Sequence, residues 1–218
     1  MNLQAKDVLG LEQMSPDEIN LILDTASDMK KIVTSKMKKV NYLQGKTVIT
    51  LFYENSTRTR VSFELAAKYM GAQAVNVSVS TSSVAKGETL IDTGITLDSM
   101  GTDIIVIRHN QSGAPHLLAK NVQASVINAG DGMHEHPTQA LLDMYTMKET
   151  FGGIKGLKVA VIGDIYHSRV ARSNIIGLTK MGAEVHLYAP STLMPTGIES
   201  LGAKAYPTIL EAVEDCDV

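Results

Sequence analysis

Short apolar runs alternate with longer amphipathic segments along most of this 218-residue chain. The apolar runs have the length and β-branched content of buried strands, and the amphipathic segments have helical spacing. A chain that alternates strand and helix in this way folds as a parallel sheet with helices on its faces. We therefore predict an α/β fold with strands at 47–53, 74–79, 103–107 and 124–128 and helices at 57–70, 88–100, 113–120 and 137–150.

The two ends of the chain extend this pattern. Ser15, Pro16 and Glu18 have the residue types of an N-cap, a first helical position and a capping-box partner, so they predict a helix start. Beyond a glycine-containing boundary at 151–156 we expect a second unit, made of a strand and its exit turn at 157–164, a strand at 184–188 and helices at 168–181 and 208–215. Two strands and two helices make a thin domain, and a further strand is expected where the chain stops. We therefore expect two doubly wound parallel-sheet domains, the second of them incomplete.

Composition narrows the classes of function. The net charge is −3, which gives no reason to expect nucleic acid or an anionic membrane as a partner. Cys216 is the only cysteine, so no intrachain disulfide can form, which suits a reducing compartment. The chain has no signal-like start and no apolar run of bilayer length. We expect a cytoplasmic protein.

The strongest candidate site lies between the first strand and the helix that follows it. Three hydroxyls and two guanidinium groups meet there, in the order Ser56, Thr57, Arg58, Thr59 and Arg60. A helix N-terminus adds unpaired N–H groups and the positive end of the helix dipole, and open α/β sheets bind ligands at this edge. Together these groups predict an anion site, most naturally for a phosphate held by the first four residues. Arg60 could equally form a helix ion pair with Glu64, one turn further on.

Two further candidates follow later strands. Arg108 comes directly after the apolar run 104–107, where an arginine can donate to a carbonyl or phosphate oxygen. His136 precedes Pro137, which fits the first helical position and makes the histidine an N-cap. Next to a helix N-terminus the imidazole stays neutral, so it can donate a hydrogen bond to a substrate carbonyl. Gln139 lies on the same helix face, three residues on.

Other polar residues receive weaker interpretations. His134, Glu135 and His136 could suggest a metal site, but no third ligand cluster or cysteine accompanies them, so we expect none. Asp143 is expected to be structural. The segment 163–171 lacks the glycine pattern of a dinucleotide site, and Arg169 at its helix start suits a carboxylate ligand. The polar segment 81–90, with Ser82 and Lys86, would by itself be taken for a surface loop.

Taken together, these motifs resemble those of aspartate transcarbamoylase catalytic chains, and the resemblance runs along the whole chain. It is carried by Ser-Thr-Arg-Thr-Arg at 56–60, Lys-Gly-Glu-Thr at 86–89 and His-Pro-Thr-Gln-Ala-Leu-Leu-Asp at 136–143. The first and third motifs are shared by carbamoyltransferases in general, including the ornithine enzyme. The segment from Ser82 to Thr89 is of the aspartate type.

The resemblance implies a carbamoyltransferase fold and a role in pyrimidine biosynthesis, with transfer of a carbamoyl group from carbamoyl phosphate to L-aspartate. It assigns the phosphate of carbamoyl phosphate to Ser56, Thr57, Arg58 and Thr59. It assigns the carbonyl oxygen to Thr59, Arg108 and His136, and the carbamoyl nitrogen to Gln139. No metal or organic cofactor is implied, because carbamoyl phosphate is already activated.

The same resemblance implies that sites are shared in a homotrimer. Arg169 would bind a carboxylate of L-aspartate, and Ser82 and Lys86 would reach the site of a neighbouring subunit. A regulatory or pathway-enzyme partner is compatible with it. The implied domains are a carbamoyl phosphate-binding domain at 1–136, an interdomain helix at 137–150 and a partial aspartate-binding domain at 151–218.

Family members continue past Val218, so the resemblance implies a C-terminally truncated chain. Two alternatives stay open on the sequence. One is an ornithine-type carbamoyltransferase. The other is a non-catalytic module that binds carbamoyl phosphate or supports assembly.

Overall fold

The computed structural model describes residues 3–78 and 87–218. The chain divides into two compact units, each of which is described by itself. The first unit consists of Met1–Leu9 and Asp24–Gly132, and the second of Gly10–Leu23 and Met133–Val218. Helix α1 (Pro16–Thr34) has residues in both. The predicted start of α1 is confirmed, because the Ser15 and Glu18 side chains each accept the other residue's backbone N–H, at 3.2 and 3.0 Å.

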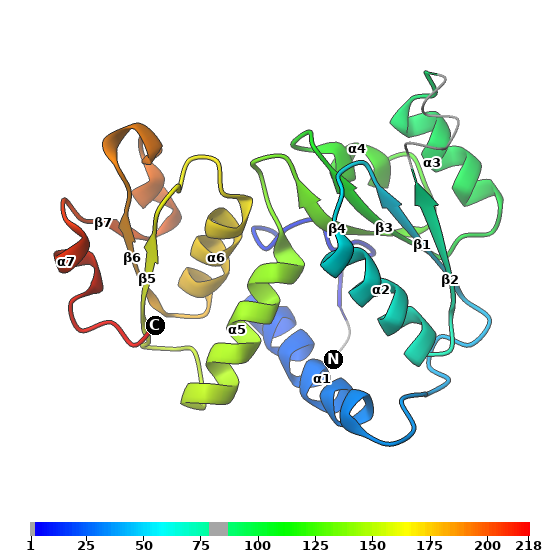
Figure 1. Ribbon diagram of the computed structural model, residues 1–218, viewed down its shortest axis with the longest axis horizontal. Helices are drawn as coiled ribbons and strands as arrows, with labels where there is room; N and C mark the ends of the chain where they lie inside the picture. Colours follow the sequence, from blue (N-terminus) through cyan, green and yellow to red (C-terminus); the bar gives the residue numbers. More distant parts are fainter. Residues whose placement is uncertain (1–2, 79–86) are drawn as a thin grey trace. The chain divides into compact units, whose positions relative to one another are not determined.

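The first unit contains a four-stranded parallel sheet in the order β2-β1-β3-β4 (Figure 1). Its strands are β1 (Thr47–Phe52), β2 (Gln73–Ser78), β3 (Ile104–His109) and β4 (Ser125–Asp131). They are connected through α2 (Thr57–Tyr69), α3 (Leu90–Ser99) and α4 (Ala114–Ala119). Parallel neighbours need such crossovers, so the predicted alternation of strand and helix leads to the observed α/β architecture.

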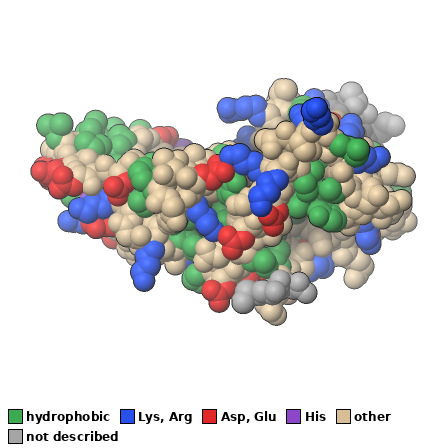
Figure 2. Space-filling view, turned by 90° about the horizontal axis from the view of Figure 1, so that it is seen from below, with side chains coloured by type: hydrophobic (Ala, Val, Ile, Leu, Met, Phe, Trp, Pro, Cys, Tyr) green, Lys and Arg blue, Asp and Glu red, His purple; other side chains and the backbone are tan. Residues whose placement is uncertain are grey.

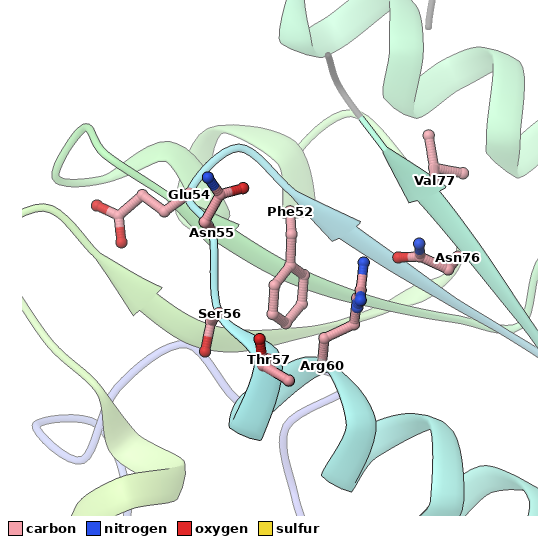
Figure 3. A pocket seen from close by; sticks show the side chains of 8 residues that line it. All are labelled: Phe52, Glu54, Asn55, Ser56, Thr57, Arg60, Asn76 and Val77. Carbon is pink, nitrogen blue, oxygen red and sulfur yellow. The ribbon is translucent and has the colours of Figure 1, made fainter. Parts of the chain in front are cut away.

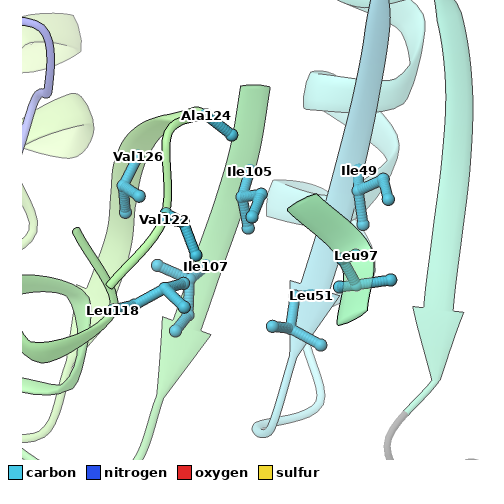
Figure 4. Close-up of a cluster of buried hydrophobic side chains, with 9 residues drawn as sticks. All are labelled: Ile49, Leu51, Leu97, Ile105, Ile107, Leu118, Val122, Ala124 and Val126. Atoms are coloured by element: carbon cyan, nitrogen blue, oxygen red, sulfur yellow. The ribbon is translucent and has the colours of Figure 1, made fainter. Parts of the chain in front are cut away.

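Both faces of this sheet are covered by helices. One face carries a buried cluster in which Leu97 of α3 and Leu118 of α4 meet strand residues (Figure 4), namely Ile49, Leu51, Ile105, Ile107 and Val126. On the other face Ala67 of α2 meets Val48, Phe52 and Val106. Successive residues of a strand point to opposite faces, so a sheet buried on both sides needs continuous apolar runs. This is why the strands were recognisable in the sequence.

The second unit has a smaller parallel sheet in the order β5-β6-β7. Its strands are β5 (Lys158–Ile162), β6 (Glu184–Tyr188) and β7 (Lys204–Ala205). Its helical elements include α5 (Pro137–Phe151), α6 (Arg169–Lys180), α7 (Ile209–Val213) and two 3₁₀ turns, η3 (Ser191–Leu193) and η4 (Ile198–Leu201). Helices α6 and α7 lie on opposite sides of this sheet (Figure 1).

Three expectations about the number and length of the strands were wrong. The second unit has a third strand, because β7 forms two residues of parallel pairing with β6 that are too short to show a sequence period. Strand β3 extends to His109, so Arg108 lies within the strand, and β4 extends to Asp131. From the sequence the first of these strands was expected to end at Ile107, its last apolar residue, and the second at Asn128, but parallel pairing continues to His109 opposite Asp131 after a register shift.

On the face shown in Figure 2, basic and acidic side chains are interspersed. This mixture fits the small net charge of −3. Within the described part of the chain, no helix is both long enough and apolar enough to cross a bilayer.

A buried carboxylate anchors the beginning of the second unit. Glu135 is 1% exposed, and its Oε2 accepts hydrogen bonds from the Leu11 N–H and the Ser173 hydroxyl, both at 2.9 Å. The Ser173 Oγ in turn accepts from the His136 N–H at 2.8 Å. A buried charge is tolerated only with such partners, so Glu135 fixes three separate segments of this unit to one another.

The segment around Leu11, which Glu135 binds through an N–H group, is also bound through its carbonyl groups. Lys180 of α6 donates to the carbonyl oxygens of Leu11 at 3.0 Å and Met14 at 2.8 Å, and also to that of Glu12. A β-carbon at Gly10 would come within 2.8 Å of the Glu135 carboxyl carbon and closer still to Oε1. Glycine is therefore required at position 10 by the space that Glu135 occupies.

We predict that Gly10→Ala destabilises the chain by about 1–3 kcal/mol, the cost of disturbing a buried hydrogen-bonded group. The added methyl group can be accommodated only if Glu135 moves away from Leu11 or Ser173. Urea unfolding measures the change in the free energy of unfolding. Gly153→Ala is the matched control, because a β-carbon there meets nothing within 4 Å. Equal stability of the two variants would show that Glu135 is not held in place.

Candidate active site

A cavity of about 340 Å³ opens where β1 ends and α2 begins (Figure 3). It lies at the carboxyl end of the parallel sheet, as predicted for a ligand site of this fold. Its wall is formed by the end of β1, the first turn of α2 and the end of β2, with the residues Phe52, Glu54, Asn55, Ser56, Thr57, Arg60, Asn76 and Val77.

The start of α2 leaves N–H groups for a ligand in this cavity. Ser56 is the N-cap, and its hydroxyl oxygen accepts from the Thr59 N–H at 3.3 Å. Its carbonyl accepts from the Arg60 N–H at 3.3 Å. The N–H groups of Thr57 and Arg58 are the ones that the helix itself does not use. They add to the positive end of the helix dipole, which favours an anion at this place.

The two arginines of this motif are placed differently. Arg60 lines the cavity, and its Nε lies 3.9 Å from Glu64 Oε1 with no hydrogen-bond partner in the described part of the chain. An ion pair of that length on a side chain that is 42% exposed contributes little. Arg60 therefore both pairs loosely with Glu64 and faces the cavity. Arg58 is exposed and, like Thr59, is not part of the cavity wall.

Arg108 approaches the same place from the neighbouring strand and is held by a carboxylate. Its Nε donates to Glu54 Oε2 at 3.0 Å, and Nη1 donates to the Ala129 carbonyl at 3.5 Å. The Arg108 and Glu54 side chains are only 16% and 27% exposed, so this ion pair is partly shielded from solvent. Glu54, which was not predicted as a site residue from the sequence, lines the cavity as well. Its only signal was an acidic residue two positions after a strand.

His109 stays beside the site as a neutral neighbour. It is 7% exposed, its Nδ1 accepts from the Gln111 N–H at 2.9 Å, and its ring lies 4.4 Å from that of Tyr53. Burial lowers the pKa of the imidazole, against the opposing influence of the Glu54 and Asp131 charges. Its accepting nitrogen is occupied by a backbone amide, which fits a packing role.

Three predicted site residues belong to the second unit. His136 is the N-cap of α5 with Pro137 as the first helical residue, as predicted. His136 is 6% exposed, and its Nδ1 lies 3.4 Å from the Thr138 hydroxyl. Gln139 donates from Nε2 to Asp143 Oδ1 at 2.9 Å. Arg169 is the first residue of α6, whose N-cap Ser168 accepts from the Ala171 N–H at 3.1 Å.

The structure thus gathers part of the predicted set. Ser56 and Thr57 line one cavity, and Arg108 is tied to a third lining residue, Glu54. Ser82 and Lys86 lie outside the described residues. The Glu135 carboxylate is occupied by Leu11 and Ser173.

Residues 6–149 match the family model described as aspartate/ornithine carbamoyltransferase, carbamoyl-P binding domain. The chain is 68% identical, over 218 residues, to the aspartate carbamoyltransferase catalytic subunit of Ruminiclostridium cellulolyticum, and the match spans all of this chain and 70% of that protein. It is 66% identical to the catalytic subunit of Acetivibrio thermocellus, again over all of this chain and 70% of the relative.

Solved structures agree with these relatives. The catalytic subunit of M. jannaschii aspartate transcarbamoylase superposes with a TM-score of 0.86 at 37% identity, covering 98% of this chain and 72% of that one. Aspartate transcarbamoylase from Trypanosoma cruzi, in complex with carbamoyl phosphate and aspartate, superposes with a TM-score of 0.87 at 35% identity, covering 95% and 68%. The chain belongs to the family of aspartate carbamoyltransferase catalytic subunits.

Proposed function

We propose that this chain transfers the carbamoyl group of carbamoyl phosphate to the amine of L-aspartate, giving N-carbamoyl-L-aspartate and phosphate for pyrimidine biosynthesis. The observation that carries the proposal is the cavity at the N-terminus of α2, lined by Ser56, Thr57 and Arg60. Its hydroxyl, guanidinium and N–H donors suit a phosphate group. The relative from Trypanosoma cruzi was crystallised with carbamoyl phosphate and aspartate, and we carry these two ligands over to this chain.

In the proposed mechanism the phosphate binds at the start of α2, held by Ser56, Thr57, Arg58 and Thr59, and Arg60 adds positive charge to the cavity. The aspartate amine attacks the carbamoyl carbon, and negative charge develops on the carbonyl oxygen. The bond between the carbamoyl carbon and the phosphate oxygen then breaks, and the released phosphate stays bound to the same donors. Positioning two substrates side by side supplies much of the acceleration.

The developing negative charge would be stabilised by Thr59, Arg108 and His136. When the Thr138 hydroxyl donates to His136 Nδ1, which lies 3.4 Å away, the ring proton is on Nε2. A neutral imidazole in this state can donate to the carbonyl oxygen. One donor to such an oxyanion contributes about 3 kcal/mol to transition-state stabilisation.

The remaining parts of the proposal concern domains and assembly. Residues 1–136 would bind carbamoyl phosphate, 137–150 would connect the domains, and 151–218 would contribute to aspartate binding through Arg169. We further propose a cytoplasmic homotrimer in which Ser82 and Lys86 complete the site of a neighbouring subunit. This assembly is compatible with a regulatory or pathway-enzyme partner. No metal or organic cofactor takes part in the proposed reaction.

The proposal is tested by incubating the purified chain with labelled carbamoyl phosphate and L-aspartate. We expect labelled carbamoyl-aspartate, and no product when L-ornithine replaces L-aspartate. Transfer to ornithine alone would contradict the proposal. A chain that binds carbamoyl phosphate without any transfer would support the non-catalytic alternative.

We predict that Arg58→Ala weakens the binding of carbamoyl phosphate by about 10–100-fold, because a charge-assisted hydrogen bond contributes about 1.5–3 kcal/mol. The free energy of unfolding should change little, because Arg58 is exposed. The dissociation constant and a urea unfolding curve measure the two effects. Lys68→Ala removes an exposed charge from the last turn of the same helix and serves as the control. Normal affinity in Arg58→Ala would contradict the assigned phosphate role.

We predict that Glu54→Gln separates binding from turnover. Neutralising this residue removes a negative charge from the cavity wall, so affinity for carbamoyl phosphate should stay equal or increase. The same change loosens the 3.0 Å contact that holds Arg108, so kcat should fall by about tenfold or more. Steady-state kinetics measure KM and kcat separately. A loss of affinity with unchanged kcat would contradict the positioning role of Glu54.

A further inference from the structure

The amide group of Gln139 has two chemically different ends, and the structure fixes which end is used internally. Its nitrogen, Nε2, donates to Asp143 Oδ1 at 2.9 Å, one turn further along α5. An ionised carboxylate accepts hydrogen bonds and cannot donate them. The reversed amide would place Gln139 Oε1 against Asp143 Oδ1, two acceptors without a proton between them. Asp143 therefore selects one orientation of the Gln139 side chain.

Asp143 is itself held by a residue from the neighbouring helix. The Nδ2 of Asn174 on α6 donates to Asp143 Oδ2 at 2.8 Å. Each carboxylate oxygen thus receives one amide N–H, from two helices that pack against each other within the second unit. All three side chains are half-buried, so solvent competes only in part for these bonds. The result is a chain of two hydrogen bonds running from Asn174 through Asp143 to Gln139.

We propose that Asp143, held by Asn174, is a specificity-determining residue that makes Gln139 present its amide oxygen to the ligand. This inference rests on the proposed function, in which Gln139 contacts the carbamoyl nitrogen. An amide oxygen accepts a hydrogen bond from the NH₂ of a carbamoyl group and gains nothing from a methyl group in the same place. The site therefore selects carbamoyl phosphate over acyl phosphates such as acetyl phosphate, which has CH₃ where carbamoyl phosphate has NH₂.

The selection follows from what each ligand leaves unpaired. When acetyl phosphate binds, the amide oxygen of Gln139 is desolvated and receives no hydrogen-bond donor in return. A site that is built to hydrogen-bond one group rejects an analogue lacking it far more strongly than an apolar pocket could. Asp143 makes no contact with the ligand in this arrangement and acts only by positioning Gln139.

The experiment compares the two phosphates as ligands of the same protein. The KM of carbamoyl phosphate and the inhibition constant of acetyl phosphate, taken as a competitor, are measured in the full chain and in Asp143→Asn. We expect the unchanged chain to prefer carbamoyl phosphate by at least about tenfold. We expect the preference to shrink at least about fivefold in Asp143→Asn, because an asparagine both donates and accepts and so tolerates either Gln139 orientation.

Glu149→Gln is the matched control, since it neutralises a carboxylate on the same helix that accepts from the Tyr145 hydroxyl at 2.9 Å. Its preference should stay within about twofold of the unchanged chain, as expected for a surface substitution. A merely structural Asp143 would weaken both ligands together and leave their ratio unchanged in Asp143→Asn. That result would overturn the inference.

A second variant keeps the test decisive if Asp143→Asn does not fold. Gln139→Met keeps the length of the side chain and removes the acceptor, so the preference for carbamoyl phosphate should nearly vanish. A preference that persists in Gln139→Met would also overturn the inference. If the unchanged chain binds neither phosphate, the proposed function itself fails, and the inference fails with it.

Discussion

The parallel pairing of β1 with β3 is the constraint on which the proposed phosphate site depends. Their register places Phe52 opposite Arg108, and the Tyr53 N–H donates to the Arg108 carbonyl at 2.8 Å. The chain leaving β1 must therefore pass the point where the Arg108 side chain emerges, which brings Glu54 to 3.0 Å from its Nε. A slip of one residue would turn Arg108 to the opposite face of the sheet.

Carboxylates are used repeatedly to hold the polar residues proposed to touch substrate. The three pairs are Glu54 with Arg108, Asp143 with Gln139, and Glu135 with the His136 backbone through Ser173. Groups that act on a transition state must be held to within a fraction of an ångström. The carboxylates provide this alignment at a cost, since Glu54 places negative charge in the wall of a cavity that suits a dianion. We expect that Glu54 lowers the affinity for an anionic ligand somewhat while it fixes the geometry of the Arg108 donor.

Features encoded within a few residues could be predicted from the sequence. The capping box at Ser15 and Glu18 and the Pro137 helix start each depend on residue types three or fewer positions apart. The order of strands and helices in the first unit follows from apolar periodicity in the same way. The strand β7 has two residues, which is too short to show an apolar periodicity, so it was missed. The ends of β3 and β4 were missed because polar residues there interrupt the apolar pattern.

The positioning residues were missed for a different reason. Glu54 and Arg108 are 54 positions apart, and Glu135 and Leu11 are 124 apart, so no local pattern connects either pair. A signal did exist, because a charge that becomes buried must find a hydrogen-bonding partner. Glu54 and Glu135 each lie between a strand end and a helix N-terminus. An acidic residue in such a position therefore indicates that the fold supplies a hydrogen-bond donor for it. Only the fold decides which of the distant donors it is, because sheet register and helix packing determine which segments meet.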